Sequence, residues 1–218
     1  MPVITLSRQF GAGGAAVGRL VARRFDGEYL DREVVFEAAR RAGVPEAIAD
    51  ELDERAPSWL TRLGFALTAA YPEVVVPDGM GGPAVPGYED RLAQITREVI
   101  EEAAGRGNVV IVGRGGAFVL RDRPGVLHVQ LEASLEARAR YCRMQAEELG
   151  GRELPDDAAL GRLCLDVDRA RAGYLRRHFG VDWRDPSHYH LVLDTGRLGL
   201  ETAAELITVA ARRLSERT

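Results

Sequence analysis

Apolar and polar residues follow one another along the chain in blocks that predict strands and helices in turn. Val3, Ile4 and Leu6 form a short apolar run that is typical of a buried strand, and a glycine-rich turn follows it. Beyond the turn, apolar residues recur at the spacing of one helix face, at Val17, Leu20, Val21 and Phe25. Residues 3–25 therefore predict a strand, a turn and an amphipathic helix.

Further apolar runs predict four more strands, at 28–31, 109–112, 126–131 and 191–193. Helical patterns begin at Tyr88, near Ser134 and after the last strand. In the final helix we expect these residues to point inward: Ala203, Leu206, Ile207, Ala210 and Leu214. Five strands that alternate with helices predict a parallel sheet with helices on both faces and ligands at the carboxyl ends of the strands.

The stretch before Tyr88 is less regular. It predicts short helices that start near Val34, near Pro45 and at Ser58, and residues 71–87 are rich in proline and glycine. We therefore expect one domain over residues 1–218, with a helical insertion on the acceptor side at 32–90 and a mobile loop at 71–87.

Composition narrows the class of protein. The chain has 218 residues and 46% hydrophobic content, enough for the core of one domain. All 29 basic residues are arginine, and 33 acidic residues bring the net charge to -4, so we expect no nonspecific nucleic-acid binding. No window approaches 18 consecutive apolar residues, which predicts a cytoplasmic protein without a membrane segment. Cys142 and Cys164 lack metal-site spacing and are expected to be packing residues.

Polar side chains follow the predicted strands where each strand ends. Ser7 and Arg8 follow the first, Asp31 the second, Arg114 the third, and Asp194 the last. The turn after Arg8 opens a helix, whose free amide groups form a binding site for an anion such as phosphate. The sequence therefore predicts a phosphate site at this edge of the sheet, although the chain contains no lysine.

Several motifs, in their order along the chain, resemble those of the cytidylate kinase-like family. ITLSRQFGAGGAAVG is similar to its opening segment, and IVGRG at 111–115 is similar to its Gly-Arg segment. LEASLEARARYC is similar to its strand-to-helix element. Asp168-Arg-Ala-Arg171 resembles its Asp-x-x-Arg motif, and LVLDTGRLG at 191–199 its last strand and turn.

The resemblance implies a three-layer α/β fold of the P-loop NTPase type, with a five-stranded parallel sheet and a small helical lid, here at 143–177. It implies phosphoryl transfer from ATP, with Mg²⁺, to a small phosphorylated acceptor such as CMP or dCMP; a homo-oligomer is compatible with it. Catalysis would rest on Arg8, Arg114 and Arg171. Phosphate binding would involve Ser7, Arg8, Gly11, Ala12, Gly13, Gly14 and Ala15. The acceptor would be bound by Asp31, Arg114, Arg138, Asp168 and Arg171, and Asp31 would also hold the metal through water.

The chain departs from the kinase pattern at several positions. Gly14 stands where these kinases have the phosphate-binding lysine, and Ala16 where they have the magnesium-binding hydroxyl. We hypothesise that Arg8 replaces the lysine, because a guanidinium binds phosphate oxygens in pairs. Arg32, Glu37 and Cys164 also differ from the pattern, which leaves the acceptor open.

Three alternatives stay open at this point. The missing lysine favours a nucleotide-binding regulator or pseudo-kinase without efficient turnover. Gly11-Ala-Gly13-Gly-Ala-Ala16, with Asp31 downstream, also fits the dinucleotide fingerprint of an oxidoreductase. His188 and His190 could share a strand face as metal ligands, although the sequence offers no third ligand.

Overall fold

The computed structural model of the chain describes residues 2–31, 88–148 and 155–216. Most of the predicted insertion at 32–90, including the loop at 71–87 and the departures Arg32 and Glu37, lies outside the described residues. So do residues 149–154 of the predicted lid.

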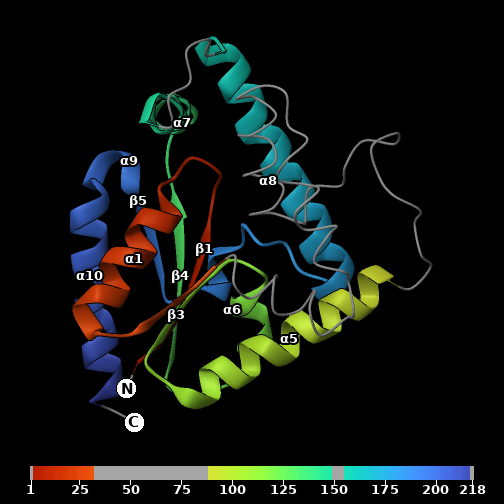
Figure 1. Cartoon of the computed structure of the whole chain (residues 1–218), viewed down its shortest axis with the longest axis vertical. Helices are drawn as coiled ribbons and strands as arrows, with labels where there is room; N and C mark the ends of the chain where they lie inside the picture. Colours follow the sequence, from red (N-terminus) through yellow and green to blue (C-terminus); the bar gives the residue numbers. More distant parts are fainter. Residues whose placement is uncertain (1, 32–87, 149–154, 217–218) are drawn as a thin grey trace.

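Five parallel strands form one sheet, as the sequence predicts (Figure 1). They are β1 (Val3–Arg8), β2 (Glu28–Leu30), β3 (Val109–Val112), β4 (Val126–Glu132) and β5 (Leu191–Asp194), in the order β2-β3-β1-β4-β5. The inner strands β1 and β3 are buried along their whole length, as expected of a parallel sheet covered on both faces.

The strand order argues against the dinucleotide-binding alternative. In a dinucleotide-binding fold the second strand lies directly beside the first. Here β2 follows the first helix, yet β3 lies between it and β1. The glycine-rich turn therefore belongs to a different α/β arrangement.

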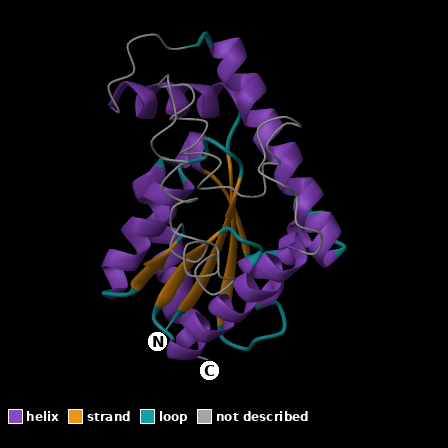
Figure 2. Cartoon of the chain, turned by 45° about the vertical axis from the view of Figure 1, so that its right-hand side comes forward, coloured by secondary structure: helices purple, strands orange, loops and turns teal. Residues whose placement is uncertain are grey.

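Helices cover both faces of the sheet (Figure 2). The elements are α1 (Gly14–Phe25), α5 (Tyr88–Arg106), α6 (Gly116–Val119), α7 (Leu135–Glu148), α8 (Asp157–Phe179), a short 3-10 turn η1 (Pro186–His188), α9 (Thr195–Leu198) and α10 (Leu200–Ser215). One apolar core joins α1 and α10 to the sheet, and a second joins α5 to the opposite face. The helix pair α7 and α8 lies beyond the carboxyl ends of the strands (Figure 1).

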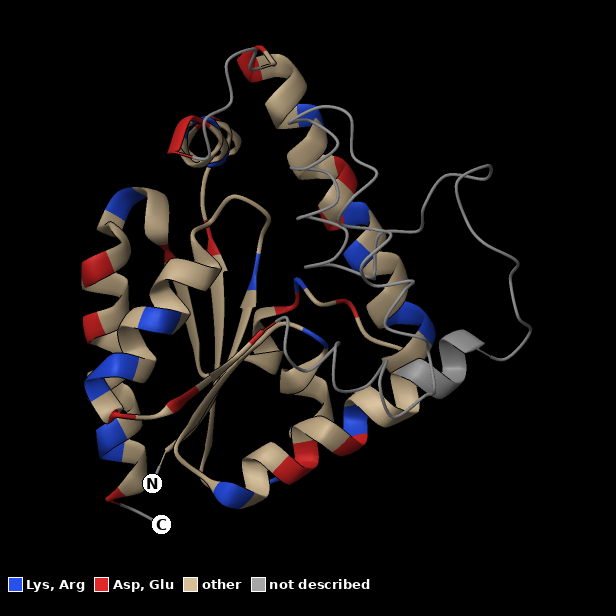
Figure 3. Ribbon diagram, viewed as in Figure 1, with Lys and Arg blue, Asp and Glu red and all other residues tan. Residues whose placement is uncertain are grey.

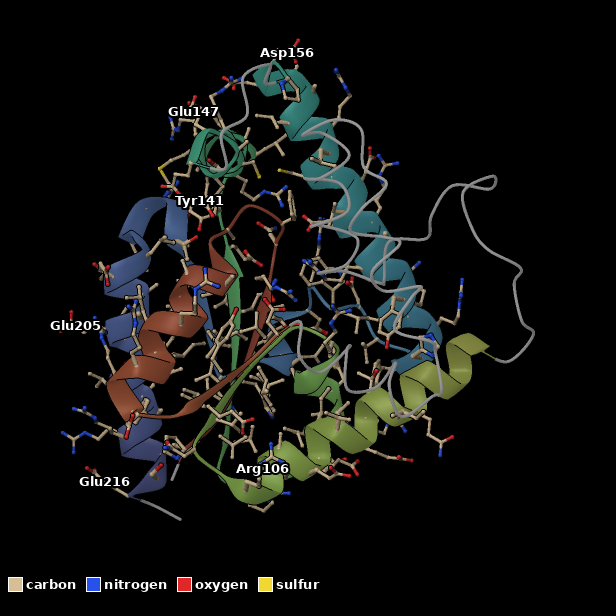
Figure 4. All side chains as sticks on the ribbon, viewed as in Figure 1. Arg106, Tyr141, Glu147, Asp156, Glu205 and Glu216 are labelled. Carbon is tan, nitrogen blue, oxygen red and sulfur yellow. The ribbon has the colours of Figure 1, made fainter. Side chains whose placement is uncertain are left out.

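The buried face of α10 differs from the predicted one at one position. Ala203, Ile207 and Ala211 are buried, whereas Leu206 is 43% exposed. Glu205, beside it, points away from the sheet (Figure 4). The prediction for Leu206 was wrong because small residues at 203, 204 and 211 let the helix pack closely along a neighbouring stripe.

The two cysteines and the histidines His188 and His190 make packing and hydrogen-bond contacts within the fold. Cys142 and Cys164 are buried free thiols in the apolar cluster between α7 and α8, with their sulfurs 3.9 Å apart. His188 packs edge-on against Phe118, and His190 accepts a hydrogen bond from the backbone N–H of His128. Among the described residues, no group of three or more His, Cys, Asp or Glu side chains is placed to hold a metal ion.

His128 makes the free energy of unfolding depend on pH. It lies buried on β4, bonded through Nδ1 to the Thr5 hydroxyl at 2.8 Å, and burial together with His190 lowers its pKa to about 4. An unfolded chain protonates this ring near about pH 6.5. Between these values the unfolded state binds more protons, so the free energy of unfolding falls on acidification, by on the order of 1–3 kcal/mol from about pH 6.5 to 4.

Urea unfolding at several pH values measures this effect. In His128→Asn the titrating ring is gone while a side-chain oxygen can still meet Thr5, so we expect the loss on acidification to shrink. An equal loss in both proteins would contradict the assignment to His128.

Candidate functional site

The site lies at the carboxyl ends of the strands, where ligands of open parallel sheets bind. The predicted polar residues that follow the strands meet at this edge. Arg8 ends β1, Asp31 follows β2, and Arg114 follows β3. All three side chains are buried.

The glycine-rich loop, residues 9–13, connects β1 to α1. Gln9 fixes its start, since its backbone N–H donates to the carbonyl of Leu131 at 2.9 Å and its side-chain oxygen accepts from the N–H of Ala133 at 3.0 Å. Gly11 and Gly13 have φ angles of 79° and 71°. No side chain caps the start of α1, so the amide groups of its first turn, at Gly14 and Ala15, can bind an anion.

The other predicted loop residues fill supporting positions. Ala12 is buried in the core beside α10, and its carbonyl accepts a hydrogen bond from the Thr195 hydroxyl at 2.9 Å. Ser7 is hydrogen-bonded to the phenol of Tyr189. The loop is therefore fixed on both sides of its glycines.

Gly11 is required by its surroundings as well as by its φ angle. A Cβ there would lie 2.8 Å from the backbone carbonyl oxygen of Arg138. We expect Gly11→Ala to cost about 1–2 kcal/mol in backbone strain alone and to displace the loop, with weaker nucleotide binding as a result. Urea unfolding and nucleotide titration check this.

Gly105→Ala, on α5, is the matched control. A Cβ at that position meets nothing within 4 Å, so we expect it to leave stability unchanged or to raise it slightly. Equal stability and equal nucleotide affinity of the two variants would contradict the role of Gly11.

Arg8 runs from the end of β1 across the start of α1. A Cβ on Gly14 would lie 2.6 Å from the Arg8 Cγ, and a Cβ on Gly113 would meet the guanidinium. Nη2 of Arg8 lies 3.5 Å from the Asp31 carboxylate. The two glycines thus leave a path for the arginine: its aliphatic part passes Gly14 at the start of α1, and its guanidinium lies beside Gly113 and Asp31. That guanidinium is a permanent positive charge in a chain that has no lysine.

Asp31 accepts hydrogen bonds from Arg8 and, at 3.0 Å, from the phenol of Tyr29. Burial and the neighbouring Asp31 raise the pKa of Tyr29, so this phenol stays a hydrogen-bond donor at neutral pH. A single carboxylate here fits a magnesium ion that arrives with a nucleotide and keeps its waters, rather than one held in a protein cage.

Arg114 has a left-handed backbone conformation with φ of 57°, between Gly113 at 76° and Gly115 at 69°. Its side chain is 4% exposed. Non-glycine residues in this region of backbone space are uncommon and cluster at functional sites. The strained turn places an arginine just after β3, the strand beside β1, which supports the prediction that Arg114 belongs to the site.

Arg138, Asp168 and Arg171 meet in a buried cluster on α7 and α8. Nη1 of Arg138 lies 2.5 Å from Oδ2 of Asp168, and Nη1 of Arg171 lies 3.6 Å from Oδ1. Oδ1 also accepts from the backbone N–H of Phe10 at 2.9 Å, and Arg171 donates to the backbone carbonyl of Arg8. The family resemblance placed these three residues in one acceptor site, and nothing in the sequence indicates that they contact the glycine-rich loop.

Sequence reasoning missed three residues beside this cluster. Trp183 is buried with its ring near the guanidinium groups of Arg171, at 5.6 Å, and Arg184, at 5.8 Å. Arg184 also lies 3.9 Å from Asp168. The Tyr189 phenol donates to the Trp183 carbonyl at 2.8 Å, and burial raises its pKa to about 12. No motif in residues 181–190 marks them as part of the site.

Comparisons with known proteins agree with this architecture. A sequence model of the Cytidylate kinase-like family matches residues 3–197. The chain belongs to that family. It is also 29% identical over 186 residues to a cytidylate kinase from Roseiflexus castenholzii, which covers 77% of each chain.

Two solved structures share the fold of this family member. An uncharacterized protein from Eubacterium ventriosum superposes with a TM-score of 0.65 and 17% identity, over 97% of this chain and 99% of that one. A shikimate kinase from Bacteroides thetaiotaomicron superposes with a TM-score of 0.51 and 16% identity, over 99% and 98%. The predicted α/β fold, a five-stranded parallel sheet with helices on both faces, is thereby confirmed.

The charged residues on the surface and the polarity of the helices describe the outside of the molecule. Acidic residues lie beside basic ones along α5, α8 and α10 (Figure 3). In the part of the chain that the structure describes, the helices are too short or too polar to cross a membrane.

Proposed function

We propose that this member of the cytidylate kinase-like family binds a nucleoside triphosphate at the glycine-rich loop and transfers its terminal phosphoryl group to a nucleoside monophosphate. The observation that carries the proposal is the position of Arg8, which lies across the uncapped start of α1. CMP and dCMP are the first acceptors to test, because the relative from Roseiflexus castenholzii is a cytidylate kinase.

Two kinds of hydrogen-bond donor bind the triphosphate in this proposal. In it, the backbone amides of the loop glycines and of Gly14 and Ala15 bind the anion at the uncapped start of α1, and Arg8 adds a guanidinium that never loses its charge. Together they supply what a lysine supplies in the usual loop of this type. Asp31 keeps Arg8 in place between binding events.

The acceptor phosphate lies next to Arg114 in this proposal. Its oxygen attacks the terminal phosphorus, the bond from that phosphorus to the bridging oxygen breaks, and the nucleoside diphosphate leaves with the bond electrons. A phosphate nucleophile needs no general base, so catalysis rests on positioning and on the positive charges of Arg8 and Arg114. The family resemblance adds Arg138, Asp168 and Arg171 to the acceptor site; their contacts with the loop suggest a further role, argued below.

Magnesium accompanies the triphosphate in this proposal. It offsets phosphate charge, and Asp31 can contact its water shell. A cytoplasmic location, where both nucleotides are available, stays a prediction, as does a homo-oligomeric state. The interleaved surface charges suit small anionic ligands better than nucleic acid.

A coupled assay of ADP release across nucleoside monophosphates, with and without magnesium, tests the proposal. We expect turnover with CMP or dCMP and loss of turnover without magnesium. Triphosphate binding without turnover for any acceptor would favour the second candidate, a nucleotide-binding regulator. That candidate is favoured by one observation, the ion pair that already engages Arg8 with Asp31.

A further inference from the structure

The glycine-rich loop is held from outside by the helix pair α7 and α8. The N–H of Phe10 donates to Asp168, and the carbonyl of Arg8 accepts from Arg171. Gly11 packs against the backbone of Arg138 closely enough to exclude a Cβ. The last residue of β1 and two residues of the loop are therefore fixed by contacts with these two helices.

The Phe10 side chain adds an apolar contact to the same helices. It is 6% exposed and lies in the cluster between α7 and α8, with Ala139, Cys142, Leu160, Cys164 and Val167. A loop residue that inserts its ring between two helices ties the loop backbone to them. Removing or shifting these helices would expose that ring to water.

Asp168 is the polar centre of this arrangement. It is 1% exposed, and its two carboxylate oxygens are engaged by the Phe10 N–H, by Arg138 and by Arg171. A buried carboxylate requires such partners, because an uncompensated charge out of water is strongly unfavourable. The two arginines thus compensate the charge of Asp168 where it accepts a hydrogen bond from the loop.

We propose that Asp168 is a positioning residue that holds the glycine-rich loop in its phosphate-binding conformation, with Arg138 and Arg171 as its counter-ions. This inference rests on the proposed function, and within it Asp168 supports binding of the triphosphate rather than of the acceptor. Substitution at Asp168 then affects the triphosphate, although the family resemblance assigns Asp168 to the acceptor. Movement of α7 and α8 would also be transmitted directly to the loop.

The isosteric variant Asp168→Asn separates these roles. It removes the charge that holds Arg138 and Arg171 but leaves the volume unchanged. We expect the Kd of a nonhydrolysable ATP analogue with magnesium, measured by calorimetry, to rise at least about tenfold, since hydrogen bonds to charged groups are among the strongest in proteins. The KM for CMP at saturating ATP is expected to change less than about threefold, and Asp168→Glu to restore part of the affinity.

Asp157→Asn is the matched control. Asp157 forms an ion pair with Arg143 at 2.5 Å between the same two helices, but at the first residue of α8, about three turns from Asp168 and next to Asp156 in Figure 4. We expect no change in nucleotide affinity there. An unchanged analogue Kd in Asp168→Asn, or a rise confined to the CMP KM, would overturn the inference.

Amide hydrogen exchange of the wild-type protein tests the inference independently of whether Asp168→Asn folds. We expect the Phe10 and Gly11 amides to gain protection with the ATP analogue and not with CMP alone. Protection by CMP alone would assign the cluster to the acceptor and overturn the inference. If the wild-type protein binds no triphosphate, the proposed function itself fails, which is a distinct outcome.

Discussion

Replacing Arg8 with alanine is expected to lower kcat/KM for the triphosphate by about 100- to 1,000-fold, the effect of losing one preorganised donor to a developing charge. In this chain the loss is not compensated by a lysine, since there is none. The variant also leaves Asp31 buried without the guanidinium at 3.5 Å. Steady-state ADP release at varied ATP measures the effect.

Arg24→Ala is a suitable control for the loss of an arginine near α1. Arg24 lies on the same helix, 3.9 Å from the exposed Glu201, and we expect its removal to change kcat/KM less than about twofold. Near-ultraviolet circular dichroism establishes that Arg8→Ala keeps its tertiary packing. A folded Arg8→Ala variant with wild-type turnover would remove Arg8 from the account.

Replacing Arg114 with alanine is expected to affect the acceptor selectively. We expect kcat/KM for CMP to fall by about 100-fold or more, because a buried guanidinium binds phosphate through paired, charge-assisted hydrogen bonds. The Kd of an ATP analogue is expected to change less than about threefold. Arg114→Lys keeps the charge but loses the planar fork, so it is expected to recover only a small part of the activity.

Arg121→Ala provides the comparison for Arg114. Arg121 follows α6 and is 64% exposed in an ion pair with Asp122, so its removal is expected to leave both substrates unaffected. A greater effect of Arg114→Ala on ATP than on CMP would contradict the assignment to the acceptor.

The strands and helices of the described chain follow from the sequence with few exceptions. A continuous apolar run identified β3, and a largely apolar run identified β4, since both faces of a parallel sheet are covered. Periodicity alone misplaced Leu206, because the buried stripe of α10 depends on which small residues allow close approach. The apolar run 126–131 also concealed His128 and Gln130, whose burial only the sheet reveals.

The candidate site was harder to predict because its contacts join distant positions. The sequence placed Arg8 and Arg114 at strand ends, but the path of Arg8 depends on Gly113, almost half the domain away in sequence. The bond from Phe10 to Asp168 spans 158 positions. Nothing in either local motif marks that pairing, and Trp183 and Arg184 lie in a segment without a recognisable pattern.

Calorimetric titration of the purified protein with a nonhydrolysable ATP analogue and magnesium tests the central claim most directly. We expect saturable binding of one nucleotide per chain, weakened at least about tenfold in Arg8→Ala. Absence of heat, together with unchanged amide protection of the glycine-rich loop, would contradict the claim that amides and an arginine bind a triphosphate here without a lysine.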